Sequence, residues 1–234
     1  MNKEKESYEK TEDYYNKYGT WYDDERIKGY YEMINKKEVE IVEKYGKDKK
    51  VLEVGCGTGI ILNEVNKFTS VANGIDLSPG MLERAKEKGL NVQVANAKSI
   101  PFDDNTFDVV YSFKVLAHIP EIRETVKETT RVVKDGGTLI LEFYNSYSLK
   151  KLANWIYNIV KKRDVYIRYD SIGKIKTYLP EDWELVDYHG IKVLALGKKL
   201  STNKFFKSVE RILSGSFMKR FGGYMVVILK KKNA

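Results

Sequence analysis

The segment VLEVGCGTG, residues 51–59, constrains the fold of this chain more than any other part of its sequence. A short apolar strand pattern leads directly into three glycines at alternate positions, and a helical pattern follows. Glycines in such a loop permit a tight turn and let a ligand approach bare backbone. The helix behind them offers unpaired N–H groups and the positive end of its dipole. The segment therefore predicts a strand, a ligand-binding loop and a helix in that order.

Strand and helix patterns alternate from this segment to residue 145. The predicted strands are Lys50–Val54, Val71–Ile75, Val92–Ala95, Phe107–Ser112 and Thr138–Phe143. The predicted helices between them are Thr58–Phe68, Pro79–Lys88 and Glu121–Val133. Short connections between alternating strands and helices indicate right-handed crossover units and a mostly parallel sheet. The sequence therefore predicts an α/β fold of the Rossmann-like type, with seven strands and helices on both faces.

The flanking segments are predicted to complete a single domain over residues 1–234. Residues 1–48 form a helical cover, in which a helix from Asp24 breaks near Asn35 and ends at Gly46. Residues 49–145 form the core. Residues 146–234 supply an inserted helix at 147–163 with basic ends, a strand Trp183–Leu196 interrupted at Gly190, a helix Phe205–Leu213 and a last strand Tyr224–Leu229.

The spacing of the glycines and of a later aspartate indicates the class of ligand. A pyrophosphate-binding fingerprint needs a third glycine where this chain has Ile60. Asp76 ends the second predicted strand, 21 residues after Gly55. An acidic side chain at that position can accept both ribose hydroxyls of an adenosine. The two features together favour a nucleoside cofactor, with or without a diphosphate.

Four motifs in order, VLEVGCGTG, GIDLSPGML, IPFDDNTFDVVYS and RVVKDGGTLILEF, resemble the class I S-adenosylmethionine (SAM)-dependent methyltransferases of the type 11 group. The resemblance covers residues 50–145. It implies methyl transfer from SAM with release of S-adenosylhomocysteine and without a metal. Around the amino-acid end of the cofactor it places Glu53, Gly55, Cys56, Gly57, Thr58 and Gly59. Against the ribose and adenine it places Asp76, Leu77, Met81, Asn96 and Ala97, and against the methionine portion Ser112 and Phe113.

The resemblance also points to residues for the methyl acceptor. It implies that the region around Lys114–Ile119 faces the substrate, with Tyr144 nearby. His118 is a candidate catalytic residue, and its alternative role is structural or helix-capping. Tyr18, Trp21 and Tyr22 are either core residues or a cover that closes over the site. The family often has aspartate where this chain has Asn96, and Asn96 can still present a carbonyl to the adenine amino group. Cys56 is interpreted as an inert small residue.

Composition excludes several other classes of protein. One cysteine and two histidines argue against a disulfide framework and against a metal centre. The N-terminal segment MNKEKESYEK is charged, and no apolar run is long enough for a membrane helix. We therefore expect a cytoplasmic protein.

The excess positive charge lies at one end of the chain. Residues 146–234 carry 19 basic and 7 acidic groups, which is a net charge of +12. The net charge of the whole chain is only +8, because the residues before 146 are slightly acidic. Such a region is either a solvated surface or a site for an anionic partner. Three functions stay open from the sequence. The first is methylation of a small or lipid-linked acceptor with peripheral membrane contact, the second is methylation of tRNA or other RNA, and the third is a SAM-binding module without catalysis.

Overall fold

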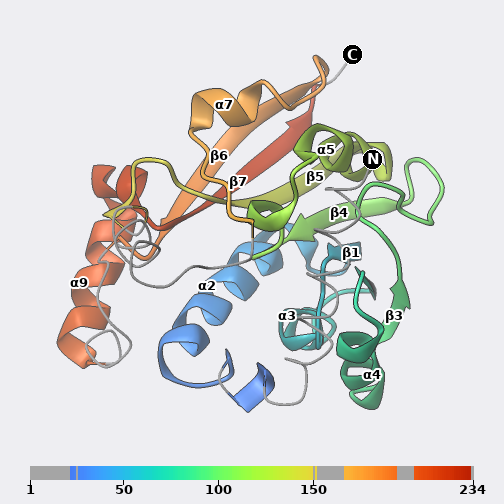
Figure 1. Cartoon of the computed structure of the whole chain (residues 1–234), viewed down its shortest axis with the longest axis horizontal. Coiled ribbons are helices and arrows are strands. Elements are labelled where there is room, and N and C mark those ends of the chain that lie inside the picture. The colour runs from blue at the N-terminus through green and yellow to red at the C-terminus, as the bar shows by residue number, and fades with distance from the viewer. Residues whose placement is uncertain (1–21, 25, 150, 152–165, 194–202, 233–234) are drawn as a thin grey trace.

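The computed structural model describes residues 22–24, 26–149, 151, 166–193 and 203–232, which build one seven-stranded sheet with helices on both faces (Figure 1). The strands are β1 (Lys50–Val54), β2 (Val71–Asp76), β3 (Asn91–Val94), β4 (Phe107–Ser112), β5 (Val133–Tyr144), β6 (Trp183–Ile191) and β7 (Tyr224–Lys231). The helices are α2 (Gly29–Gly46), α3 (Ile60–Val65), α4 (Pro79–Glu87), α5 (Ile122–Arg131), α7 (Ile172–Lys176) and α9 (Lys204–Gly215). The 3-10 turns are η1 (Leu116–His118) and η2 (Phe217–Phe221).

The strand order of the sheet is β3-β2-β1-β4-β5-β7-β6. Within the group β1 to β5, every pair of neighbouring strands is parallel. Strand β7 is antiparallel to both of its neighbours, β5 and β6. The chain winds outward from β1 to β3 and then resumes at β4 on the other side of β1. Such a reversal opens a crevice at the carboxyl ends of the central strands. The predicted Rossmann-like, mostly parallel seven-stranded sheet is confirmed.

Successive residues of the central strands point into two separate apolar cores. Val51 and Val109 pack in the core that α2 and α3 cover. Leu52 and Val110 pack in the core that α5 and α7 cover. A strand buried on both faces is apolar along its whole length, which explains uninterrupted runs such as Val226–Leu229.

The N-terminal helix is interrupted at a different place from the one the sequence predicted. Helix α2 runs unbroken through Asn35, and the interruption lies earlier, where Lys28 is extended and Gly29 has a φ of 60°. The Asn35 amide donates a hydrogen bond to the Arg26 carbonyl (2.9 Å), so its polar group is bonded without opening the helix. The prediction of a break at Asn35 is therefore wrong. Residues 22–24 and 26 are helical and form what we call the N-terminal turn.

Strand β6 continues through Gly190, where the sequence predicted an interruption. Gly190 pairs with Met225 of β7, and a Cβ atom on it would lie 1.9 Å from the Lys219 carbonyl oxygen of η2. The glycine therefore marks the close approach of another backbone segment. Helix α7 is an element that no sequence pattern predicted. The helix predicted at residues 147–163 lies almost wholly outside the described residues, as do Tyr18 and Trp21.

Candidate active site

A cavity opens where the carboxyl ends of β1, β2 and β4 meet, and the glycine loop forms its floor. Gly55, Gly57 and Gly59 all have positive φ angles, of 79°, 53° and 76°. The Gly55 and Cys56 N–H groups donate to the Ile75 carbonyl (2.7 and 3.0 Å), which fastens the loop to β2. A Cβ atom on Gly55 would lie 2.2 Å from Val115, whereas one on Gly57 would meet nothing within 4 Å. Gly57 therefore presents bare backbone to open space.

Asp76 joins the loop to the end of β2. Its carboxylate accepts hydrogen bonds from the Gly57 N–H (2.8 Å) and the Ser78 N–H (2.9 Å). Burial raises the pKa of Asp76, and the backbone N–H donors oppose that rise. Ser78 in turn caps α4 by accepting from the Met81 N–H (3.2 Å). The carboxylate thus lies in the cavity wall at a fixed position.

Glu53 and Lys114 also line the cavity, and each contacts a buried partner. Tyr111 donates a hydrogen bond to Glu53 (3.3 Å), and burial raises the pKa of Glu53 well above its ordinary value. The Lys114 ammonium forms an ion pair with Glu38 and donates to the Asn35 side-chain oxygen (3.1 Å). Lys114 was predicted to contact the substrate, and this ion pair holds its charged end against α2.

The N-terminal turn closes one side of the cavity. Asp23 accepts hydrogen bonds from the Thr58 hydroxyl (2.5 Å) and from the Lys88 ammonium (2.6 Å). Lys88 also donates to the Thr58 carbonyl (2.7 Å), so three side chains tie the turn to the glycine loop. Tyr22 and Arg26 line the cavity from this turn.

Arg26 is a functional candidate that the sequence reasoning missed. Its guanidinium lies over the rings of Tyr22 and Tyr31, 5.0 and 4.2 Å from their centroids. Its Nε atom is buried without a hydrogen-bond partner, and it forms no ion pair with an acidic residue in the described part of the chain. A partly buried cation whose Nε atom has no partner is costly unless a ligand supplies an acceptor. Arg26 reaches the cavity that Gly57 also lines because the chain turns at Gly29, and the sequence around Gly29 did not predict that turn.

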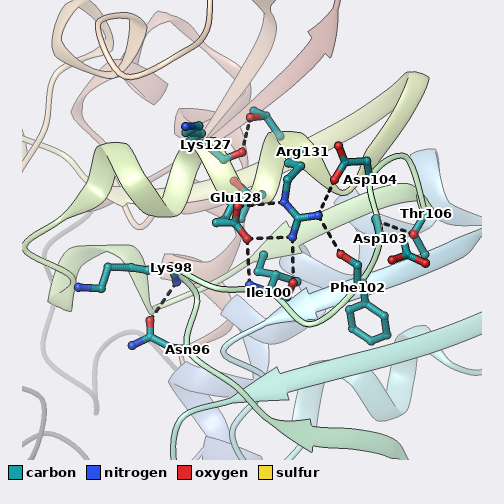
Figure 2. Close-up of polar contacts among 12 residues, drawn as sticks. Asn96, Lys98, Ile100, Phe102, Asp103, Asp104, Thr106, Lys127, Glu128 and Arg131 are labelled. Carbon is teal, nitrogen blue, oxygen red and sulfur yellow. Dashed lines mark hydrogen bonds and ion pairs between the residues drawn. The ribbon is translucent and has the colours of Figure 1, made fainter.

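The loop after β3 forms the third side of the cavity through Ala95, Asn96 and Ala97. Figure 2 shows how α5 holds the rest of this loop through Arg131. Arg131 donates to the carbonyls of Ile100 and Phe102 (both 2.9 Å) and pairs with Asp104 and Glu128. Glu128 also accepts from the Ile100 N–H (3.0 Å). The network fixes the loop that carries Asn96 and Ala97.

Glu128 is expected to contribute stability that depends on pH. Hydrogen bonds from Arg131 lower the pKa of the Glu128 carboxyl. A carboxyl with a lowered folded-state pKa stabilises the protein above its unfolded pKa, and this contribution is lost as the pH falls through the folded pKa. Glu128→Gln is expected to lower the free energy of unfolding by about 1–2 kcal/mol at neutral pH, with the difference shrinking below about pH 4.

Urea unfolding of both proteins at neutral and acidic pH measures this difference. Glu124→Gln, at an exposed position of the same helix, is the matched control and is expected to change stability by less than about 0.5 kcal/mol. A loss for Glu128→Gln that is equally large at both pH values would contradict the role of the charge.

The wall beyond β4 is mainly apolar. Phe113, Val115, Ile119 and Pro120 line the cavity there, and His118 lies among them. The His118 Nδ1 atom is 2.9 Å from the Tyr166 carbonyl oxygen. Because a carbonyl only accepts, Nδ1 carries the proton and the neutral ring has its lone pair on Nε2.

Most predicted site residues described by the structure come together in this one cavity. Those that line it are Tyr22, Glu53, Gly55, Cys56, Gly57, Thr58, Asp76, Leu77, Met81, Asn96, Ala97, Phe113, Lys114 and His118. The missed lining residues include Arg26 and Asn35.

Three predicted residues lie outside the cavity lining. A Cβ atom on Gly59 would face Leu90 and Ala85, because this residue turns the backbone into α3. Ser112 is fully buried, and its hydroxyl donates to the Val54 carbonyl (2.7 Å). Tyr144 packs its ring against His118, Tyr169 and Tyr224. All three support the site from behind instead of facing it.

Comparison with known proteins agrees with this geometry. A family model described as "Methyltransferase domain" matches residues 52–141. An uncharacterized protein of Methanocaldococcus jannaschii is 30% identical over 232 residues, covering 94% of this chain and 90% of that relative. The chloroplastic tocopherol O-methyltransferase of Arabidopsis thaliana is 35% identical over 133 residues, which are 51% of this chain and 38% of that protein.

A solved structure extends the likeness to the whole fold. A SAM-dependent methyltransferase of Thermotoga maritima superposes with a TM-score of 0.65 at 19% identity, covering 94% of this chain and 98% of that one. The fold, the matched domain and the relatives agree with the cavity at the carboxyl ends of β1, β2 and β4. The chain therefore belongs to the class I SAM-dependent methyltransferases and is an enzyme of that class.

Proposed function

We propose that the cavity binds SAM through the residues that line it. The Asp76 carboxylate, at the end of β2, would accept the ribose hydroxyls. Leu77 and Met81 would flank the adenine, and Asn96 would meet its amino group. Bare backbone at Gly57 leaves room for the amino-acid end of the cofactor, which Glu53 would approach from the strand beneath.

Arg26 completes the fit of the cavity to this cofactor. SAM carries a carboxylate, and Arg26 is a cation in the cavity wall with a buried, unbonded Nε atom. An ion pair with that carboxylate would give the guanidinium an anionic partner. Burial lowers the pKa of Arg26, the surrounding tyrosines raise it, and the net shift is upward, so the side chain is charged. Cofactor binding would thereby also hold the N-terminal turn in place.

Gly57→Ala is expected to weaken SAM binding with little loss of stability. The new methyl group meets no protein atom within 4 Å but enters the space left for the cofactor. We expect a loss of SAM affinity of about tenfold or more from the steric conflict, and about 1 kcal/mol of destabilisation from the positive φ.

Gly89→Ala is the matched control for this prediction. Gly89 has a φ of 75°, an added Cβ atom on it also meets nothing within 4 Å, and it lies outside the cavity lining. It is expected to destabilise the protein equally and to bind SAM like the wild type. Calorimetric titration and thermal unfolding of both variants separate the two effects, and unchanged SAM binding by Gly57→Ala would contradict the placement of the cofactor.

We propose a small apolar or lipid-linked molecule as the methyl acceptor, with S-adenosylhomocysteine as the second product and no metal in the reaction. The observation that carries this proposal is the apolar wall of Phe113, Val115, Ile119 and Pro120 beside the cofactor residues. Lys114, the lysine among the described residues that line the cavity, is engaged by Glu38 and Asn35. The resemblance to a tocopherol methyltransferase supports the same class of acceptor.

The residues of this chain would act mainly by alignment. SAM supplies a methyl group on a positively charged sulfur, which is already activated for in-line transfer to a nucleophile. The apolar wall and Tyr22 would exclude water and hold the acceptor in line. His118 would accept the proton at Nε2 if the acceptor is a hydroxyl group. We propose that the reaction takes place in the cytoplasm.

Transfer of radiolabelled methyl groups into a detergent-solubilised extract of the source cells tests the proposal. The extract is separated into organic-soluble, aqueous small-molecule, RNA and protein fractions, with Asp76→Ala as the blank. We expect label in the organic-soluble or small-molecule fraction. Label that ribonuclease removes would instead establish RNA as the acceptor and would overturn the proposal.

A further inference from the structure

We propose that the outer face of α9 and η2 docks onto an anionic lipid membrane. This face, the α9 surface, consists of Lys204, Phe205, Lys207, Arg211, Ile212 and Phe217. The inference rests on the proposed lipid-linked acceptor and names the surface that brings the enzyme to it.

Large apolar side chains are exposed on this surface. Phe205, Ile212 and Phe217 are 68%, 68% and 70% exposed. Phe205 and Ile212 are seven residues apart on one helix, so their directions differ by only about 20° and they form one stripe. Apolar side chains exposed together in this way mark a surface for another molecule or a membrane.

The orientation of α9 is fixed by its inner face. The Glu210 carboxylate, which is buried, accepts hydrogen bonds from the Val193 N–H (2.7 Å) and the Ser214 hydroxyl (3.0 Å). Val193 lies outside α9, so the helix cannot rotate to bury Phe205 and Ile212 without breaking the hydrogen bond between the Val193 N–H and Glu210.

Basic side chains run beside the apolar stripe. Lys204 and Arg211 are also seven residues apart, and Lys207 lies next to them on the helix surface; all three are exposed. In the described residues from 203 to 221, Glu210 is the one acidic residue, and its side chain faces inward. A helix with an apolar stripe flanked by cations fits the boundary between anionic headgroups and acyl chains.

The α9 surface lies at the same edge of the sheet as the cavity. Tyr224, which begins β7, pairs with Tyr144 at the end of β5 and with Ile191 at the end of β6. Strand β5 is parallel to β4, whose end leads into the cavity residues Phe113 and Lys114. Figure 1 shows α9 beyond this end of β6 and β7. A membrane on the α9 surface would therefore lie at the edge where the acceptor must enter.

Cosedimentation with lipid vesicles tests the proposal. The vesicles are phosphatidylcholine alone, or phosphatidylcholine mixed with phosphatidylglycerol. The apolar variant is Phe205→Ser with Ile212→Ser, and the basic variant is Lys204→Glu, Lys207→Glu and Arg211→Glu. The control variant carries Lys47→Glu, Lys49→Glu and Lys86→Glu, which are exposed positions elsewhere on the protein.

We expect the wild type and the control variant to bind the phosphatidylglycerol vesicles and to bind phosphatidylcholine much more weakly. The apolar variant is expected to lose about tenfold or more in binding and the basic variant about 100-fold. Equal losses for the basic and control variants would overturn the proposal. So would binding of the wild type to RNA but not to vesicles.

Two further measurements separate this proposal from the proposed function. All variants are expected to bind SAM like the wild type, which shows that they are folded. All are also expected to label the organic-soluble fraction of a detergent-solubilised extract, because no membrane is present there. Labelling in detergent without any vesicle binding would overturn the docking surface alone.

Discussion

Gly190→Ala is expected to lower the free energy of unfolding by at least about 3 kcal/mol. The new Cβ atom would lie 1.9 Å from the carbonyl oxygen and 2.6 Å from the carbonyl carbon of Lys219. These are backbone atoms of η2, so no side-chain rotation relieves the overlap. The opposite contact is also tight, because a Cβ atom on Gly222 would lie 2.9 Å from the Gly190 Cα. Substitution must therefore separate β6 from η2.

Gly215→Ala is the control for this effect. An added Cβ atom at Gly215, the last residue of α9, meets nothing within 4 Å. This variant is expected to match the wild type or to gain up to about 1 kcal/mol through the reduced freedom of the unfolded chain. Urea unfolding followed by circular dichroism measures both variants. Equal stability of Gly190→Ala and Gly215→Ala would contradict the close approach of η2.

Asp76→Ala is expected to weaken SAM binding by about 100-fold or more, because a charged acceptor of two hydrogen bonds is lost. The loss of the carboxylate also leaves the Gly57 and Ser78 N–H groups without their acceptor. Asp76→Asn, which keeps one acceptor oxygen, is expected to lose less affinity. Calorimetric titration with SAM gives the affinities.

Asp103→Ala controls for the removal of a negative charge near the site. Asp103 is exposed on the loop after β3 and does not line the cavity. It is expected to bind SAM as tightly as the wild type. Thermal unfolding of all three variants checks that they are folded. Wild-type affinity in Asp76→Ala would show that the ribose lies elsewhere.

The sequence predicts those parts of the site that local patterns determine. The turn from β1 through Gly55, Gly57 and Gly59 lies within one strand–loop–helix unit, and Asp76 ends the next strand. Each position follows from a short stretch of chain and from the rule that parallel strands present their carboxyl ends at one edge. The same alternation of patterns predicted a mostly parallel sheet of seven strands, and this prediction is confirmed.

The parts that the sequence does not predict depend on contacts between distant segments. Arg26 reaches the cavity because the chain turns at Gly29 and because Asp23 binds Thr58 and Lys88. The glycine at position 190 predicted a break in the strand, but its actual role is to allow the close approach of the η2 backbone. Ser112 and Tyr144 end their strands, yet each side chain contacts a residue of the cavity lining, Val54 and His118, instead of entering the cavity. In each case a tertiary contact decides what the local pattern leaves open.

A crystal structure of the protein grown with S-adenosylhomocysteine tests the central claim most directly. We predict difference density in the cavity, with the ribose at Asp76, the adenine between Leu77 and Met81 with its amino group at Asn96, and the carboxylate at Arg26. Density for the ligand at any other place, or a carboxylate that contacts another residue while Arg26 stays unpaired, would contradict the assignment of the site.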